Sequence, residues 1–173
     1  MENNIYNNEF LDYGNGNKVH RTAIINANVE MGSGNRVGAY CVIGSNGEIR
    51  GVDQDDFRGK VVIGNNNVIS ELVTIQAPLE AGAVTKIGDN NIIMAHAHIG
   101  HDAKIGDWTE VCTSTVIGGY AVICNGAKIK IRSAIRNRVM IAQAAVVGMG
   151  SVVTKDVQYG AVVYGNPAKQ RGE

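Results

Sequence analysis

An isoleucine or valine recurs every six residues through almost the whole chain. The positions of this step are Val19, Ile25, Met31, Val37, Ile43, Ile49, Ile63, Ile69, Ile75, Ala81, Ile87, Ile93, Ile99, Ile105, Val111, Ile117, Ile123, Ile129, Ile135, Ile141, Val147 and Val153. Of these 22 positions, 20 are Ile or Val. A stripe at this spacing would spiral around an α-helix, which has about 3.6 residues per turn. The repeat therefore argues against a helical fold.

A second position of each repeat, two residues before the large one, is restricted to smaller side chains. Examples are Ala97, Ala103, Thr109, Thr115, Ala121, Ala127, Ser133 and Ala145. A Gly, Asn or Asp often follows the large residue, which is typical of a turn. Each repeat therefore predicts one short strand and one corner. Three repeats make a triangular coil, and successive coils stack about 4.8 Å apart around a β-branched core.

Two segments interrupt the six-residue step and predict loops. The interval from Ile49 to Ile63 is longer than two whole repeats, so we expect a loop near residues 50–62. A second loop is expected near 76–86, where Pro78 occurs and Ala81 is a weak core residue. Loops on a rigid scaffold often carry binding sites. The resulting division is a polar N-terminal segment or cap (1–18), a β-helix (19–155) and a C-terminal tail (156–173).

Composition narrows the functional class. The 16 basic and 16 acidic residues cancel, so we expect neither a nucleic-acid partner nor a membrane surface. No signal-like or membrane-spanning apolar run is found, and the three cysteines form no CxxC pair, so a cytoplasmic protein is expected. Cys41 falls on an inward position. Cys112 and Cys124 are expected to point outward on different faces, where a disulfide between them is disfavoured.

The stretch MAHAHIGHDAKIG, residues 94–106, places three histidines within six residues. The repeat separates them, because His98 points outward from a strand while His96 and His101 lie at the preceding and following corners. His96 and His101 would be about 15 Å apart along an extended face. Zinc ligands must each lie about 2 Å from the ion, so a three-histidine metal site within one chain is disfavoured.

His101 combines with two other residues in a different arrangement. Asp102 follows it directly, and Gly119 lies three repeats after His101 along the chain, one coil away. An imidazole can remove a proton at neutral pH. A backbone N–H about 5 Å from such a base suits the oxyanion of a tetrahedral intermediate. These three residues are the candidate catalytic group.

The repeat resembles that of the hexapeptide-repeat acyltransferases, whose fold is a left-handed parallel β-helix and which are usually homotrimers. The handedness is implied only by this resemblance. Residues 92–106, IIMAHAHIGHDAKIG, are similar to a stretch of the UDP-N-acetylglucosamine O-acyltransferases of lipid A synthesis. The resemblance implies that His101 is the general base, that Asp102 orients it and that Gly119 forms the oxyanion hole. His98 would contact the acyl donor or the sugar.

Other positions match the family less closely. The loop sequence VDQDDFRG is similar to the family's sugar-nucleotide loop, which implies Asp55 as a substrate ligand and Arg58 in place of a lysine. Gln76, Tyr120 and Arg136 stand where the family has histidines, so the sugar stays open. The hexapeptide-repeat carbonic anhydrases fit poorly, because Gly106 stands where they need a second histidine.

The C-terminal stretch GMGSVVTKDVQYGAVVYGNPAKQRGE resembles the closing signature of acetyl-CoA-dependent hexapeptide acetyltransferases. This implies a coenzyme A site with Gly118, Lys155, Lys169 and Arg171. We therefore expect a homotrimeric enzyme that moves an acetyl group from acetyl-CoA to an amine or hydroxyl of a nucleotide-linked sugar, without a metal. The alternatives are a UDP-N-acetylglucosamine O-acyltransferase that uses acyl carrier protein, and a non-catalytic trimeric solenoid that binds a sugar nucleotide or a protein.

Overall fold

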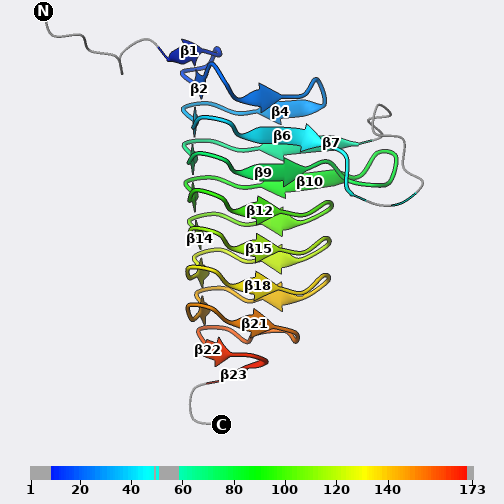
Figure 1. Ribbon diagram of the computed structural model, residues 1–173, viewed down its shortest axis with the longest axis vertical. Helices are drawn as coiled ribbons and strands as arrows, with labels where there is room; N and C mark the ends of the chain where they lie inside the picture. The colour runs from blue at the N-terminus through cyan, green and yellow to red at the C-terminus, as the bar shows by residue number, and fades with distance from the viewer. Residues whose placement is uncertain (1–8, 49, 51–58, 171–173) are drawn as a thin grey trace, which may run out of the picture.

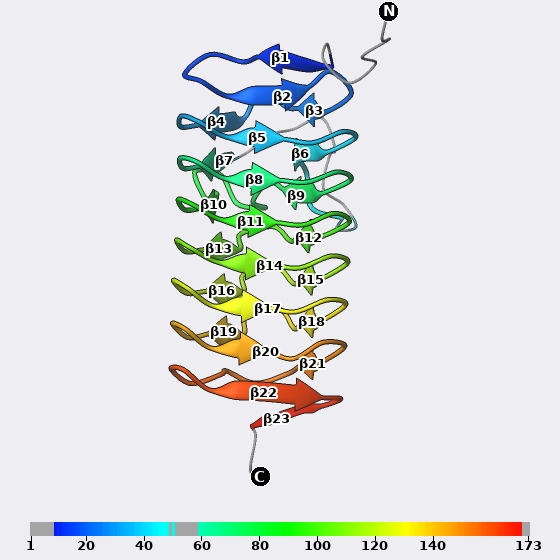
Figure 2. The ribbon, with the colours of Figure 1, turned by 90° about the vertical axis from the view of Figure 1, so that its left-hand side faces the viewer.

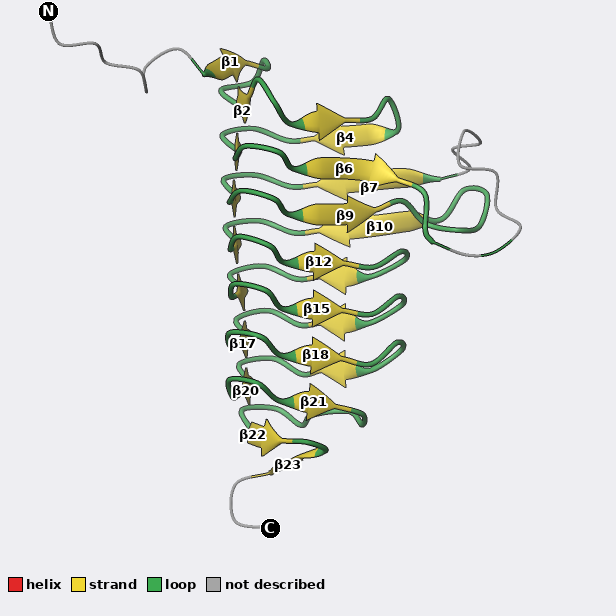
Figure 3. Cartoon of the chain, in the orientation of Figure 1, coloured by secondary structure: helices red, strands yellow, loops and turns green. Residues whose placement is uncertain are grey.

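The fold is a stack of short strands. The computed structural model describes residues 9–48, 50 and 59–170, so the predicted core residue Ile49 lies outside the described residues. Within these residues the regular structure consists of strands alone (Figure 3). No helix long and apolar enough to cross a membrane occurs in the described part of the chain.

The strands form three sheets, here named A, B and C. Sheet A contains β1 (Phe10–Asp12), β2 (Lys18–His20), β5 (Arg36–Val37), β8 (Val68–Ile69), β11 (Ile92–Ile93), β14 (Glu110–Val111), β17 (Lys128–Ile129), β20 (Val146–Val147), β22 (Val162–Gly165) and β23 (Ala168–Gln170). Sheet B contains β3 (Ile24–Ile25), β6 (Val42–Ser45), β9 (Thr74–Gln76), β12 (His98–Ile99), β15 (Val116–Ile117), β18 (Ala134–Ile135) and β21 (Val152–Val153). Sheet C contains β4 (Val29–Met31), β7 (Lys60–Ile63), β10 (Val84–Ile87), β13 (Lys104–Ile105), β16 (Val122–Ile123) and β19 (Met140–Ile141).

The chain visits the sheets in the order A, B, C and then returns to A. In the regular coils each strand pairs in parallel with the strand three repeats later, as His98 does with Val116. Figure 2 shows the strands of sheet A at the front running left to right, after which the chain passes behind on the right and returns on the left as it descends. This winding is left-handed. The structure is therefore a left-handed parallel β-helix, as predicted.

The six-residue isoleucines fill the centre of the prism. Large side chains such as Ile63, Ile99 and Ile117 are almost completely buried. Burying a side chain of this size stabilises a fold by about 1.5–3 kcal/mol, so the stacked column supplies much of the driving force. Ala81 is an exception to the repeat, because it is exposed in a loop.

Two loops leave the β-helix at the same edge, where sheet B turns into sheet C. Residues 46–59 connect β6 to β7, and residues 77–83 connect β9 to β10. Their described parts lie on one side of the stack, next to the turn between β12 and β13 (Figure 1). The loops pack together, because a β-carbon added to Gly59 would lie 2.3 Å from Cγ of Pro78. This edge is called the B–C edge below.

Each end of the β-helix carries an antiparallel strand pair. At the N-terminal end β1 pairs antiparallel with β2. At the other end β22 continues the parallel stack on β20, and β23 folds back on β22. The stack therefore extends beyond residue 155, because Val162 and Val163 take the places of a further repeat against Val146 and Val147.

Cys112 does not point into solvent, contrary to the expectation from its place in the repeat. It is only 4% exposed, and its thiol donates a hydrogen bond to Oε1 of Glu110 at 3.2 Å. Glu110 in turn forms an ion pair with Lys130 at 2.6 Å. Burial and the neighbouring carboxylate raise the pKa of the Cys112 thiol to about 11. Spacing alone does not reveal the contacts of Cys112 with Glu110 and of Glu110 with Lys130.

Candidate functional site

The three clustered histidines occupy different parts of the coil. His96 lies in the turn between sheets A and B, with a φ of 60°. His98 begins β12 on the outer face of sheet B, and His101 lies in the following turn on the B–C edge. No group of three His, Cys, Asp or Glu that could hold a metal ion is present among the residues that the structure describes.

His101 and Asp102 form a buried pair on the B–C edge. His101 Nδ1 lies 3.0 Å from Oδ2 of Asp102, and both side chains are about nine-tenths buried. A carboxylate accepts hydrogen bonds, so Nδ1 carries the proton and Nε2 presents its lone pair. Nε2 has no hydrogen-bond partner among the described residues. This arrangement prepares the imidazole to accept a proton at Nε2.

Gly119 lies directly beneath the His101 ring, in the next coil. A β-carbon added to Gly119 would lie 2.5 Å from both Nε2 and Cε1 of His101. Any other residue at 119 would therefore displace the imidazole. The Gly119 N–H donates to no acceptor in the described part of the chain, whereas the adjacent Gly118 N–H donates to the Ile135 carbonyl at 2.9 Å. A free donor thus accompanies the base.

The two loops cover the N-terminal side of the pair. The Leu79 N–H donates to Oδ2 of Asp102 at 3.1 Å, so the same oxygen serves both loop and imidazole. A β-carbon added to Gly47 would lie 2.8 Å from Leu79 and 3.2 Å from His101. Gln76 is buried, and its Oε1 accepts a long hydrogen bond of 3.3 Å from the His101 N–H.

His98 lies next to this group on sheet B. Its Nδ1 lies 2.8 Å from the hydroxyl of Thr74. Burial lowers the pKa of His98; Glu48 acts in the opposite direction, and the charge of His101 lowers the pKa further. His98 therefore has both the candidate base, His101, and Glu48 of the first loop among its charged neighbours. The resemblance predicts a substrate contact at this position.

Tyr120 follows Gly119 and contacts His101 edge-on, with ring centroids 5.1 Å apart at 87°. The guanidinium of Arg138, one coil further, stacks 4.1 Å from the centre of the Tyr120 ring. Arg136 is exposed on the same edge. His101, Tyr120 and Arg138 thus follow one another along the B–C edge.

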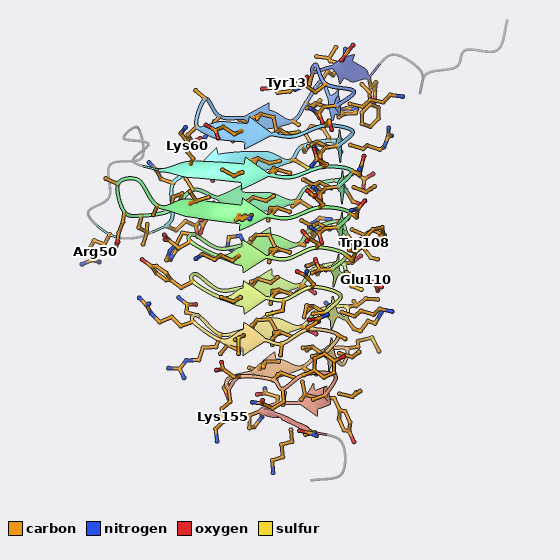
Figure 4. All side chains as sticks on the ribbon, turned by 180° about the vertical axis from the view of Figure 1, so that it is seen from behind. Tyr13, Arg50, Lys60, Trp108, Glu110 and Lys155 are labelled. Carbon is orange, nitrogen blue, oxygen red and sulfur yellow. The ribbon has the colours of Figure 1, made fainter. Side chains whose placement is uncertain are left out.

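A groove of about 480 Å³ lies at the C-terminal end of the β-helix, between the last turn of the B–C edge, which carries Lys155, and the pair β22–β23, which carries Lys169. Figure 4 shows Lys155 on the same side of the stack as Arg50, with Trp108 and Glu110 on the opposite side. Gly118 has a packing role, because a β-carbon there would lie 2.3 Å from Oδ1 of Asn137.

Three of the predicted site residues, Asp55, Arg58 and Arg171, lie outside the described residues. The repeat did not reveal Leu79, because a backbone N–H carries no sequence signal. It also missed Thr85, whose hydroxyl accepts a hydrogen bond from the Asp102 N–H at 2.8 Å. Thr occurs at several inward positions, so residue type alone does not distinguish this one.

The chain is similar to known proteins in both sequence and fold. Residues 85–119 match the family described as bacterial transferase hexapeptide (six repeats). No curated protein matches the sequence. The UDP-N-acetylglucosamine acyltransferase from Bacteroides fragilis superposes with a TM-score of 0.84 and 28% identity, covering 90% of this chain and 60% of that one. The Arabidopsis UDP-N-acetylglucosamine acyltransferase gives 0.82 and 29%, covering 91% and 62%.

A similar match is found with the UDP-N-acetylglucosamine O-acyltransferase from Moraxella catarrhalis, with a TM-score of 0.71 and 26% identity, covering 89% of this chain and 74% of that one. The chain spans about three fifths of the length of the Bacteroides and Arabidopsis structures. It therefore shares their β-helix and carries the hexapeptide repeat.

Proposed function

We propose that this hexapeptide-repeat protein, whose β-helix is that of the UDP-N-acetylglucosamine acyltransferases, transfers an acyl group to a nucleotide-linked sugar with His101 as the general base. The observation that carries the proposal is the buried pair of His101 and Asp102 above the side-chain-free Gly119. The pair supplies a base, and Gly119 leaves room for the imidazole and offers a backbone N–H that has no acceptor among the described residues. Acyl transfer needs both.

The reaction follows from this geometry. Nε2 of His101 removes the proton from the hydroxyl or amine of the acceptor as that atom attacks the thioester carbonyl carbon. The Gly119 N–H donates to the oxyanion that forms. The C–S bond then breaks, and the imidazolium returns its proton to the leaving thiolate. Asp102 stabilises the imidazolium and keeps the proton on Nδ1, without itself taking it up.

The acceptor is proposed to be a sugar carried on a nucleotide. Each of the similar structures described above is named for action on UDP-N-acetylglucosamine. The half-buried His98 and the loop residues near Gly47 border the base and would contact this substrate. Asp55 and Arg58 are proposed as further ligands on the basis of the loop sequence.

The acyl donor is proposed to be acetyl-CoA. Lys155 lies three coils from His101, about 14 Å along the axis at roughly 4.8 Å per coil. Arg136 and Arg138 are exposed on the same edge between them. Arginine and lysine bind phosphate through charge-assisted hydrogen bonds, so this edge suits a coenzyme with several phosphates. A second candidate donor is an acyl carrier protein thioester, which the sequence similarity around His101 favours.

We also propose that the protein is a homotrimer that associates through sheet B. The outward side chains of that sheet carry no permanent charge; they are Ile24, Val42, Thr74, His98, Val116, Ala134 and Val152. Sheets A and C each expose several charged side chains, among them Arg36 and Lys128 on A and Lys86 and Lys104 on C. An exposed face without charges suits contact with another subunit. The B–C edge would then border the interface.

A substrate screen tests this function. Nucleotide sugars are incubated with acetyl-CoA or with acyl carrier protein thioesters, and release of the free thiol is followed. Turnover with acetyl-CoA supports the first donor, and preference for the carrier protein supports the second. Binding of a nucleotide sugar without thiol release from either donor class would instead identify a non-catalytic binding solenoid.

A further inference from the structure

Two successive turns on the B–C edge, 118–121 and 136–139, follow one hydrogen-bonding rule. In each of them the turn residue with positive φ stacks on a residue of the coil above. It donates its N–H to the carbonyl of the residue just before that stacking partner. Tyr120 donates to the His101 carbonyl at 2.9 Å, and Arg138 donates to the Gly119 carbonyl at 3.0 Å. The edge is therefore held by a ladder of backbone bonds that runs along the stack.

Asp102 stands where this ladder ends. By the rule its N–H would donate to the carbonyl of Ala77, but the coil above leaves the β-helix at that residue to form the loop 77–83. The Asp102 N–H instead donates to Oγ1 of Thr85 at 2.8 Å. Asp102 has a φ of 59°, a conformation that side-chain-bearing residues adopt at a cost. The Thr85 hydroxyl thus replaces the missing carbonyl at a strained residue of the site.

Thr85 is also unusual for its place in the core. It is completely buried, in the inward column of sheet C. The other members of that column are apolar: Val29, Val61, Ala103, Ala121 and Val139. Valine has nearly the shape of threonine without the hydroxyl, and a buried hydroxyl is unfavourable unless it is hydrogen-bonded. Packing alone therefore does not account for a threonine at this position.

We propose that Thr85 is a positioning residue for the catalytic pair. Its hydroxyl fixes the Asp102 backbone, so that Oδ2 stays between the Leu79 N–H and the His101 Nδ1–H. This in turn keeps the ring proton on Nδ1 and the lone pair on Nε2. The inference rests on the proposed function for its effect on turnover, but its effect on the His101 ring is independent of any reaction.

The test compares Thr85→Val and Thr85→Ala with Thr85→Ser. Valine and alanine both occur elsewhere in the column, so these variants are expected to fold, and serine keeps the hydroxyl. Thr115→Val is the matched control, because Thr115 is equally buried and its hydroxyl donates to the Lys130 carbonyl at 3.2 Å, in the turn between sheets A and B.

Two readouts are measured. NMR of the imidazole nitrogens is expected to show the Nδ1–H tautomer of His101 in the wild type, Thr85→Ser and Thr115→Val, and a tautomer mixture in Thr85→Val and Thr85→Ala. With the substrates in hand, kcat should fall about tenfold in the last two at unchanged KM, a loss confined to the transition state. An unchanged His101 tautomer in both variants would overturn the inference, even if their thermal stability falls. If both variants show the expected tautomer mixture but the wild-type protein transfers no acyl group, only the proposed function is overturned.

Discussion

The His101 imidazole lies on the α-carbon of Gly119, which belongs to the next coil of the β-helix. A β-carbon at residue 119 would lie 2.5 Å from two atoms of that ring. The base and the proposed oxyanion donor therefore lie on neighbouring rungs of one rigid ladder. Their relative position is set by the spacing of the coils, and the two loops cover the His101–Asp102 pair.

Gly119→Ala should abolish most activity by displacing the imidazole. A methyl group cannot fit 2.5 Å from ring atoms, so His101 must rotate away from Asp102. We expect kcat to fall by about 10²-fold or more, as for loss of a general base. The control is Gly126→Ala, where nothing lies within 4 Å of the added carbon and a φ of 68° makes the change mildly destabilising. Equal kcat values for both variants would contradict the proposed contact.

His98 should make the protein less stable as the pH falls. Burial lowers its pKa below the ordinary value of 6.5, so the unfolded chain takes up a proton before the folded protein does. The free energy of unfolding should therefore decrease as the pH falls through about 6.5, until the folded protein is protonated as well. Urea denaturation at several pH values measures this. His98→Gln should reduce the change of the unfolding free energy with pH, whereas the exposed His96→Gln should leave it unaltered. The opposite result would show that His98 is not the group responsible.

A charge on sheet B should dissociate the proposed trimer. Val116 is 47% exposed on sheet B, and Val68 is 42% exposed on sheet A. Val116→Lys is expected to give monomers in sedimentation experiments, because an interface core disfavours an unpaired charge. Val68→Lys, of nearly equal exposure, should leave the mass unchanged. Dissociation by Val68→Lys alone would place the interface on sheet A.

Cys112 should resist alkylation in the folded protein. Its thiol is buried and has a pKa of about 11, so little thiolate forms at pH 8. Cys124 is more accessible. Mass spectrometry after brief treatment with iodoacetamide should find Cys124 modified first, and Cys112 only after unfolding. Glu110→Gln should speed labelling of Cys112, because the carboxylate both accepts the thiol hydrogen bond and repels the thiolate.

The sequence predicts the fold because one physical requirement recurs in every coil. Each inward isoleucine, such as Ile99, must stack on its counterpart in the next coil, so the period itself specifies the strands, corners and core. The sequence predicts the boundaries of the loops less precisely. Ala81 continues the six-residue step by coincidence but lies exposed in a loop, and only packing distinguishes the two environments.

The sequence also brings His101, Asp102 and Gly119 together, because all three lie on regular positions of the repeat. It does not reveal the contacts of the second loop. The Leu79 N–H and the buried Gln76 side chain meet the pair from a segment where the period is broken. Thr85 escapes detection because its importance comes from a missing backbone carbonyl, and no residue type marks such an absence.

The central claim is that His101 is the base of an acyl transfer, and its most direct test is the turnover of His101→Gln. With the nucleotide sugar and acyl donor found by the substrate screen, single-turnover rates are measured for the wild type, His101→Gln and the neighbouring His96→Gln. We predict that His101→Gln is slower by about 10²–10⁴-fold, the usual contribution of a general base, while His96→Gln matches the wild type. A His101→Gln enzyme as fast as the wild type would contradict the account.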